Sequence, residues 1–375
     1  MYRGGAAALV IIFLTSVARF YHQGTGFTAL LAMPAGHEYE TPAFRAVPHY
    51  ENPAWASYDG QFYVQLALDP LLRDPATDHA MDLAPFRARR ILFSWTAYLL
   101  GAGRPQWVVE IYALQNVVCW LVLAALLTRW IPLTSIRGLA IWTACLFAHG
   151  MMWSVRFALL DAPSLLLSAL AVVAIERGHP LLSALVTGVS ALGRETNLLV
   201  TVAQPVPTNG RQWVRLAVAA AVALMPLLIW YDYLRSIYRS TLLAGTDSLV
   251  LPGTGIGQVW GRSFIAVTHN GLLSADAPIF GILFALATQA VYVIARREYA
   301  LPWWRIAVAY AMLMFVVDRD LAHPLTGAIT RVLLPMTVGF NILLMSEQHN
   351  SRFWPWFGAG NLHLLPAVHV MPLLG

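Results

Sequence analysis

Long apolar runs alternate with short polar segments along most of the chain. The clearest runs, rich in Ala, Leu, Val and aromatic residues, cover positions 4–18, 107–128, 138–152, 164–175, 181–192, 216–230, 278–295, 303–317 and 332–345. A helix needs about 20 mostly apolar residues to span a bilayer, and several runs approach that length. The pattern predicts an all-α polytopic membrane protein, a single domain over residues 1–375 with about 9–11 transmembrane helices.

Two long polar segments interrupt this pattern, at residues 21–90 and 231–276. The first is rich in acidic residues and proline, and it is too long for a simple turn. We predict that both are external loops, and that the first carries short interfacial helices, of which 61–72 is the best candidate. Two shorter apolar pieces, 91–101 and 198–206, predict a half-immersed helix and half of a broken helix.

Composition agrees with a membrane location. Of the 375 residues, 58% are hydrophobic and only 11% are charged, whereas soluble domains have about 25% charged residues. Most arginines fall in segments that we assign to the cytoplasm, as expected for topology determinants. The cluster Arg87-Ala-Arg-Arg90 falls on the external side and counts against this rule. The net charge of +5 comes with no aromatic-interleaved basic patch, so we expect no nucleic-acid partner.

The stretch Trp55-Ala-Ser-Tyr-Asp-Gly-Gln-Phe-Tyr63 lies in the first polar segment. Gly60 allows the backbone beside Asp59 to turn tightly or to approach a ligand closely. The aromatic residues around that carboxylate suit a sugar ring or the headgroup level of a membrane. Asp59 is therefore either the centre of a chemical site or the N-terminal cap of an interfacial helix.

Four polar clusters fall on one predicted side of the membrane. They are Asp59 with Asp69, Arg156 with Asp161, Arg194 with Glu195, and the segment Asp318 to Arg331. Ionisable groups near a bilayer are costly and usually face a cavity or each other. Arg194 and Glu195 form either a structural ion pair or a cavity wall in which Arg194 binds phosphate and Glu195 orients it. Arg331 either binds a lipid phosphate through its guanidinium or snorkels at a helix end.

The sequence contains no histidine spacing typical of a metal site. Asp318 and Asp320 could hold a cation, but a solvated loop tip is the simpler interpretation. Phosphate-binding glycine loops, nucleophile elbows and zinc-protease motifs are also absent from the sequence. Chemistry driven by a cytosolic nucleotide is therefore unsupported.

This layout resembles the GT-C superfamily of integral-membrane glycosyltransferases. Members have a first helix followed by a long external loop that carries an essential acidic residue. The stretch Tyr58-Asp-Gly-Gln-Phe-Tyr63, followed by Asp69-Pro70, is similar to a bacterial group in that superfamily tied to cell-surface glycopolymers. Gly193-Arg-Glu-Thr196 and Arg331-Val-Leu-Leu-Pro335 resemble further segments of the group.

The resemblance implies that a sugar passes from a polyprenyl-phosphate-linked donor to a glycan, lipid or protein acceptor. It implies Asp59 as general base on the acceptor hydroxyl, or as a ligand of a metal that does this. Arg194 and Arg331 would neutralise the departing lipid phosphate, and Asp161 with Arg156 would face Asp59 across the cavity. The substrate-binding candidates are Tyr58, Gln61, Tyr63, Asp69, Arg156, Asp161, Arg194, Glu195 and Arg331. Because the first loop has no Asp-x-Asp motif, we assign no metal ligand, and a divalent metal stays open.

The resemblance also implies a multi-pass protein of the bacterial inner membrane whose active site is on the periplasmic or external side. Two other functions fit the same residues. A transporter or flippase for lipid-linked sugars would use the arginines to bind phosphate without chemistry, but polar groups would then spread across both leaflets. A non-catalytic membrane subunit of glycopolymer assembly would not need Asp59.

Overall fold

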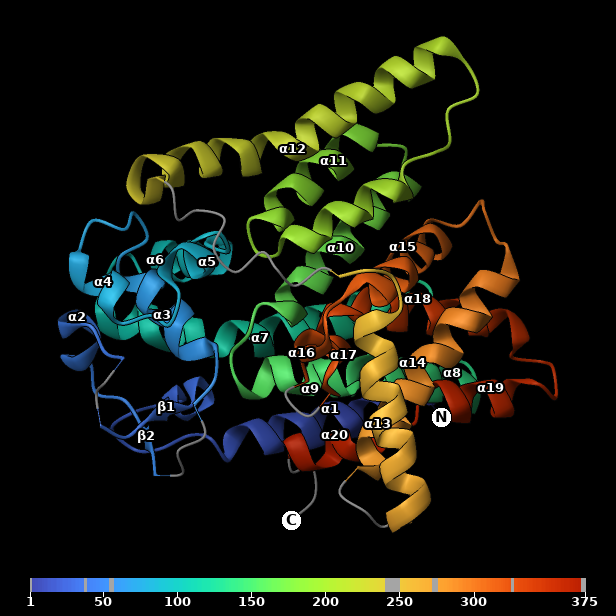
Figure 1. The fold of residues 1–375 in the computed structure, drawn as a ribbon, viewed down its shortest axis with the longest axis horizontal. Coiled ribbons are helices and arrows are strands. Elements are labelled where there is room, and N and C mark those ends of the chain that lie inside the picture. The colour runs from blue at the N-terminus through green and yellow to red at the C-terminus, as the bar shows by residue number, and fades with distance from the viewer. Residues whose placement is uncertain are drawn as a thin grey trace.

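The computed structural model describes residues 2–36, 39–53, 57–239, 250–271, 276–324 and 327–371. Helices dominate the molecule (Figure 1). The only strands in these ranges, β1 (Met33–Pro34) and β2 (Glu51–Asn52), form one short parallel pair. The prediction of a helical protein is therefore correct.

Most apolar runs form helices with nearly the predicted bounds. They are α1 (Tyr2–Ala18), α7 (Pro105–Leu127), α10 (Asp161–Glu176), α11 (Pro180–Ala191), α14 (Ala277–Arg296), α15 (Pro302–Val316) and α18 (Leu334–Leu344). By length and composition, α7, α14 and α12 (Gly210–Tyr238) are able to cross a membrane. The bent pair α8 (Ile136–Leu146) and α9 (His149–Arg156) would make a fourth span. The described helices thus support a membrane protein, and the count of 9–11 spans stays a prediction.

A bend of 47° separates α8 from α9. The indole Nε1 of Trp120 donates a hydrogen bond of 2.8 Å to the carbonyl of Leu146. In a continuous helix that carbonyl would instead accept from the amide four residues later. The bend turns α9 towards α17 (Ala328–Val332), where a Cβ on Gly150 would lie 2.4 Å from the Thr330 carbonyl. Glycine at position 150 therefore allows these two helices to touch.

The first polar segment folds into a packed unit. Its helices are α2 (Pro42–Arg45), α3 (Gly60–Leu68), α4 (Pro75–His79) and α5 (Ala84–Ala88), preceded by the 3₁₀ turn η1 (Thr28–Leu31). Figure 1 draws this unit in blue and cyan at one side of the molecule, beside α6 (Leu92–Leu100) and α7. Buried side chains such as Phe44, Phe62 and Leu66 join it to α6 and α7 in one hydrophobic core.

Helix α3 is not interfacial, contrary to the prediction. All of its residues except Leu68 are buried. Gln65 is buried because its side chain is fully used: Oε1 accepts from the amide of Thr41 at 2.6 Å and Nε2 donates to the Gln61 carbonyl at 3.1 Å. Buried polar groups need such partners, and one of these, Thr41, comes from a segment more than twenty residues away.

The prediction of a loop over 231–276 is also wrong for the described residues. Helix α12 continues to Tyr238, and α13 runs over Thr254–Asn270. Most of α12 is exposed in this chain. Its polar residues after position 230 can therefore stay outside the core, and the helix continues through them. Figure 1 shows α12 as one long helix along the edge of the molecule. Residues 240–249 and 272–275 lie outside the described ranges.

Short elements complete the fold. They are the 3₁₀ segment η2 (Glu195–Ala203), α16 (Arg319–Ala322), α17, η5 (Met345–Glu347), α19 (Phe353–Gly360) and α20 (Leu364–Val370). The predicted half-helix at 198–206 is thus mostly a 3₁₀ segment, and the tail forms two helices too short to span. The largest core cluster includes Phe13, Trp120, Tyr310 and Phe340 and joins both ends of the chain.

Candidate functional site

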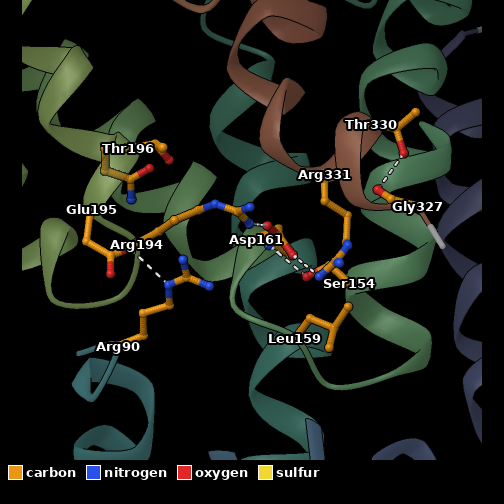
Figure 2. Close-up of polar contacts among 12 residues, drawn as sticks. Arg90, Ser154, Leu159, Asp161, Arg194, Glu195, Thr196, Gly327, Thr330 and Arg331 are labelled. Atoms are coloured by element: carbon orange, nitrogen blue, oxygen red, sulfur yellow. Dashed lines mark hydrogen bonds and ion pairs between the residues drawn. The ribbon is translucent and has the colours of Figure 1, made fainter. Parts of the chain in front are cut away.

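One cavity brings together charged residues from five parts of the chain. Its volume is about 670 Å³. Its wall is formed by α3, the end of α5, the start of α10, the start of η2 and the segment from α15 to α17. The charged residues that line it are Asp59, Arg87, Arg89, Arg90, Asp161, Arg194, Glu195, Asp318, Asp320 and Arg331. Figure 2 shows the part of the site around Asp161.

Asp59 stands directly before α3. The first helical residue, Gly60, packs against the end of α9, where a Cβ would lie only 2.2 Å from the carbonyl oxygen of Phe157. Any side chain here would push α3 away from α9. The Asp59 side chain makes no capping hydrogen bond, which excludes the alternative of a helix cap. The close contact instead holds the carboxylate at the cavity wall.

The Asp59 carboxylate is paired with an arginine. Its Oδ1 accepts a hydrogen bond of 3.0 Å from Arg87 Nη2, and the side chain is 29% exposed. Burial disfavours its charged form, but the positive charges of Arg87 and Arg331 outweigh this effect and hold the pKa below its ordinary value. Asp59 is therefore ionised at neutral pH. Among the described residues, no hydrogen-bond or ion-pair partner occupies its Oδ2.

Arg87 serves two carboxylates at once. Besides Asp59, it donates from Nη2 to Asp82 at 2.7 Å and from Nε to the same carboxylate at 2.9 Å. Its guanidinium also lies over the Phe62 ring, 4.8 Å from the centroid. These contacts hold the arginine in one orientation beside Asp59.

Asp161 lies between two guanidinium groups. Its carboxylate forms ion pairs with Arg194 and, at 3.3 Å, with Arg331, and its side chain is only 2% exposed (Figure 2). It is the first residue of α10, where the helix dipole also favours a negative charge. We call Arg194, Asp161 and Arg331 the Asp161 triad.

A buried hydrogen-bond network fixes the turn that leads to Asp161. Ser154 Oγ donates to Asn116 Oδ1 at 2.9 Å and accepts from the amide of Ala162 at the same distance. Asn116 Nδ2 donates to the carbonyl of Leu159 at 2.7 Å. Two side chains from α7 and α9 thus anchor both ends of the turn, and this determines where the carboxylate points.

Tyr58 holds the guanidinium of Arg331, and Thr330 anchors the backbone before it. Its Nη2 donates to the hydroxyl of Tyr58 at 2.7 Å, and the guanidinium lies 5.0 Å from the centre of the same ring. The preceding residue, Thr330, bonds to the ring of His149 at 3.0 Å and donates to the carbonyl of Gly327 at 2.9 Å. The arginine is 9% exposed in its side chain, so it is a wall residue of the cavity and does not snorkel.

Glu195 also lies between two arginines. Its carboxylate accepts from Arg90 Nε at 2.9 Å and lies 3.8 Å from Arg89 Nε. Burial opposes its ionisation, but the charge of Arg90 outweighs this and lowers the pKa of Glu195. We call Arg89, Glu195 and Arg90 the Glu195 triad. Arg194 and Glu195, although adjacent in sequence, therefore each have partners of their own, which replaces the simple ion pair considered from the sequence.

Most of the predicted site residues lie together. The cavity wall includes Tyr58, Asp59, Tyr63, Asp161, Arg194, Glu195 and Arg331. These residues are up to 273 positions apart in sequence, as the contact between Tyr58 and Arg331 shows. One hollow is therefore shared by Asp59, Asp161, Glu195 and Arg331. Trp55, at the start of the motif, lies outside the described residues.

Three predicted substrate-binding residues do not line the cavity. Arg156 donates to the carbonyl of Ala29 at 3.2 Å and lies over the ring of Phe20, so it does not accompany Asp161. Asp69 accepts from the backbone amides of Arg73 and Asp74 at 3.0 and 2.9 Å and organises the loop after α3. Gln61 lies on the buried face of α3.

The cluster Arg87, Arg89 and Arg90 was not among the predicted site residues. All three line the cavity, and their guanidinium groups surround the ring of Phe86 at 4.4 to 5.5 Å from its centroid. A signal existed in the sequence, because this was the one basic cluster that violated the positive-inside tendency in the predicted topology. An arginine cluster on the side of the membrane that disfavours it needs negative partners or a ligand.

The donors in the cavity suit anions better than metal ions. Within the described ranges, no group of three or more His, Cys, Asp and Glu side chains is arranged to hold a metal. The carboxylates of Asp59, Asp161 and Glu195 each already pair with one or two guanidinium groups. A divalent cation at Asp161 or Glu195 would have to displace arginines, and Asp59 offers only its Oδ2, so the described residues form no ready set of metal ligands.

Comparison of the chain with protein-family models, with curated proteins and with solved structures gives no match.

The cavity is amphiphilic. The arginines and carboxylates described above form one part of its wall, and Leu313, Val317, Leu321 and Val332 contribute apolar surface from α15 to α17. Guanidinium groups bind phosphate through paired hydrogen bonds, and aliphatic side chains accept a hydrocarbon chain. An ionised carboxylate, Asp59, lies in the same space. This arrangement can bind an amphiphilic anion and can accept a proton beside it.

Proposed function

We propose that this protein transfers a sugar from a polyprenyl-phosphate-linked donor to an acceptor hydroxyl at the external face of a membrane. The observation that carries the proposal is the joint presence in one cavity of the Asp59 carboxylate, the arginines of the Asp161 triad and an apolar wall. The sequence resemblance to the GT-C superfamily points in the same direction. The acceptor is a glycan, lipid or protein of the cell surface.

The arginines support the phosphate part of the proposal. Arg331 and Arg194 each keep a guanidinium at the cavity wall, and both share only one carboxylate, Asp161. A lipid phosphate that leaves the sugar develops negative charge, and preorganised positive charge at that position lowers the barrier. The apolar residues Leu313, Val317 and Leu321 would contact the first isoprene units of the carrier.

Asp59 supports the proton-transfer part. In the proposed step, its free Oδ2 takes the proton of the acceptor hydroxyl while the acceptor oxygen forms a bond to the anomeric carbon. The bond between that carbon and the phosphate oxygen breaks, and the electron pair leaves with the lipid phosphate. Arg87 holds the carboxylate in place, and its charge keeps Asp59 in the deprotonated form that the step requires.

The membrane location rests on the apolar helices α7, α12 and α14. We further propose that the membrane is the bacterial plasma membrane and that the site faces its external side. A donor that is already activated on a lipid needs no nucleotide there.

The proposal is tested by an assay of the detergent-purified protein. Synthetic polyprenyl-phosphate sugars serve as donors and a cell-envelope extract supplies the acceptor, with Asp59→Asn compared with wild type. Asp59→Asn is expected to lower transfer by about 10²–10⁴-fold, the usual contribution of a general base. Asp232→Asn, on the exposed surface of α12, is the matched control and should retain full activity.

The outcomes separate the alternatives. Transfer that is unchanged in Asp59→Asn would remove the catalytic assignment. Donor that crosses the bilayer of reconstituted vesicles without any release of sugar would indicate a flippase. Neither transfer nor movement of donor would indicate a non-catalytic subunit.

A further inference from the structure

Arg331 lies on a helix that is too short to be stable alone. Helix α17 spans only Ala328–Val332, little more than one turn, and an isolated helix of that length does not persist in water. Its first turn starts from Gly327, whose φ of 67° lies in the left-handed region. The position of the Arg331 guanidinium therefore depends on contacts that other elements make with this turn.

A chain of side-chain hydrogen bonds connects this turn to α9. Trp153 Nε1 donates to His149 Nε2 at 3.1 Å, and His149 Nδ1 lies 3.0 Å from Thr330 Oγ1. The Thr330 hydroxyl in turn donates to the carbonyl of Gly327 at 2.9 Å (Figure 2). The same carbonyl accepts the backbone amide of Arg331 at 2.9 Å. The chain thus begins on α9 and ends on the carbonyl that opens the helix of Arg331.

The ends of this chain determine the direction of every bond in it. An indole N–H can only donate, so His149 Nε2 accepts and carries no proton. The neutral imidazole then carries its proton on Nδ1, which donates to Thr330 Oγ1. That oxygen can accept because its own hydrogen points to Gly327. The opposite tautomer would place two N–H groups against each other, so His149 is held in the Nδ1–H form.

Burial makes this arrangement resistant to change. His149 and Thr330 are both 4% exposed, and a buried polar group that loses its partner is costly. Gly150 adds a steric limit, because the two helices are in backbone contact at its position. Any shift of α17 along α9 would break the hydrogen-bond chain or create a clash, so α9 fixes where α17 lies.

Trp153 also supports the other end of the Arg331 side chain. A Cβ on Gly327 would lie 2.6 Å from Trp153 Cγ, so the indole packs directly on the start of α17. The same indole lies 5.2 Å from the ring of Tyr58, whose hydroxyl accepts from Arg331 Nη2 at 2.7 Å. One tryptophan therefore contacts the groups that hold both the backbone and the guanidinium of Arg331.

These supporting residues stand behind the cavity wall. The described residues that line the cavity include Tyr58 and Arg331 but not Trp153, His149 or Thr330. A ligand in the cavity would therefore meet Arg331 and Tyr58 directly. Trp153, His149 and Thr330 would affect it only through the orientation of that arginine.

We propose that Trp153 and His149 are positioning residues, which act through Thr330 and Tyr58 to hold the Arg331 guanidinium at the cavity wall. The proposal rests on the proposed function only for the ligand that this guanidinium meets, the phosphate of the lipid-linked donor. A preorganised donor lowers a barrier because it does not have to reorient during the reaction. Without this support, Arg331 would keep its charge but lose its fixed direction.

The first test measures the mobility of Arg331 in the ligand-free, detergent-purified protein. Nuclear magnetic resonance of arginine-labelled protein reports rotation of each guanidinium, and the Arg331 signal is the one absent from Arg331→Gln. Thr330→Val, which removes the hydroxyl at nearly constant volume, should speed this rotation by about fivefold to tenfold, as for one lost hydrogen bond. Thr330→Ser should restore the wild-type rate. Asp161 pairs with Arg331 in all of these Thr330 variants, since none changes a charge.

The same experiment with labelled histidine tests the tautomer directly. The His149 signal, identified by its absence from His149→Gln, should show a proton on Nδ1 in wild type. Trp153→Phe keeps an aromatic ring but removes the indole N–H, so the Nε2–H form should become populated. The matched control for Thr330→Val is Thr143→Val, because Thr143 donates to the carbonyl of Leu139 on α8, outside the cavity lining. It should leave both signals unchanged.

The second test measures binding by calorimetry, with farnesyl phosphate as the anionic ligand and farnesol as the uncharged reference. Thr330→Val should weaken farnesyl phosphate about tenfold, as for the loss of one charge-assisted contact, and leave farnesol unchanged. In the Arg331→Gln background the same substitution should have no further effect, because residues that act through one group are not additive. A merely structural role of Thr330 would weaken both ligands in both backgrounds.

The proposal is overturned if Arg331 rotates equally fast in wild type and in folded Thr330→Val. It is also overturned if Thr330→Val weakens farnesyl phosphate as much in the Arg331→Gln background as alone. Melting temperatures report folding, and Trp153→Phe replaces Thr330→Val in both tests if the latter does not fold. If Arg331→Gln binds farnesyl phosphate as tightly as wild type, the phosphate assignment of the proposed function fails, and the rotation rates alone decide the positioning role.

Discussion

Two buried polar regions of this protein are built on opposite principles. One is an amide network of Gln289, Thr337, Asn341 and Asn361, which joins α14, α18 and the chain after α19. The other is the charged cavity. The amide network contains only neutral groups, and Asn341 and Asn361 donate to each other's side-chain oxygens at 3.1 Å in both directions.

The difference lies in how the hydrogen-bonding capacity is used. In the amide network, Gln289 accepts from Thr337 and donates to the Gly360 carbonyl, so the groups satisfy one another. In the cavity, ionised groups face each other: Asp161 and Glu195 each contact two guanidinium groups, and Arg87 contacts two carboxylates. A neutral network that closes on itself stabilises the fold, whereas ionised groups that line an open cavity can exchange partners with a ligand. The comparison predicts that substitutions in the two regions change different properties.

Among the substitutions that compare the two regions, the largest effect should follow from Arg331→Gln. This change removes the charge that we assign to the leaving phosphate and should lower transfer about 10²–10³-fold, as for the loss of one preorganised donor. The melting temperature should change little, because Asp161 keeps Arg194 as its partner. Arg331→Lys should recover part of the activity, since it restores the charge without the paired geometry. Wild-type activity in Arg331→Gln would contradict the assignment.

The amide network should show the reverse pattern. Asn341→Leu leaves the Asn361 amide buried without its partner, which should lower the free energy of unfolding by about 1–3 kcal/mol. The transfer rate per folded molecule should stay within twofold of wild type. The double variant Asn341→Leu, Asn361→Leu should regain stability, because both partners become apolar. Chemical denaturation in mild detergent and the transfer assay measure the two properties, and a loss of activity without a loss of stability would break the comparison.

The smallest effect should be a change in pH dependence. Positive charge from Arg87 contributes to holding the pKa of Asp59 below its ordinary value, against the effect of burial. In wild type the pairing stabilises the folded state above the pKa of the unfolded chain, about 3.9 for an aspartate. That stabilisation is lost as pH falls through the lower folded pKa. Arg87→Gln should therefore move the acid limb of the pH–rate profile to higher pH, and an unmoved limb would argue against Asp59 as the titrating group.

The sequence predicts the helices of the apolar runs well, since a run such as 107–128 has few alternatives to a helix in an apolar environment. It predicts the polar segments poorly. Helix α3 looked interfacial because it lies in a polar segment and carries apolar residues such as Phe62 and Leu66. The partner of its Gln65, the amide of Thr41, is supplied only by the fold. Helix α13 was missed because its glycines and polar residues weaken the apolar signal.

The site was predictable where unlike charges interrupt apolar sequence. Asp161, Arg194 and Arg331 stood out for that reason, and they do meet. Arg156 looked equivalent to them in sequence, but α9 directs it to the carbonyl of Ala29. The direction of Arg156 depends on the bend between α8 and α9, where a tryptophan distant in sequence, Trp120, binds the carbonyl of Leu146. Periodicity alone cannot supply that information.

The most direct test of the account follows both products of a single turnover. Wild-type protein is mixed with a donor labelled in the sugar and in the lipid, together with the cell-envelope extract. The account predicts that labelled sugar appears on the acceptor at the same rate and in the same amount as free polyprenyl phosphate, and that Asp59→Asn forms neither. Equal product formation by Asp59→Asn and wild type would contradict it.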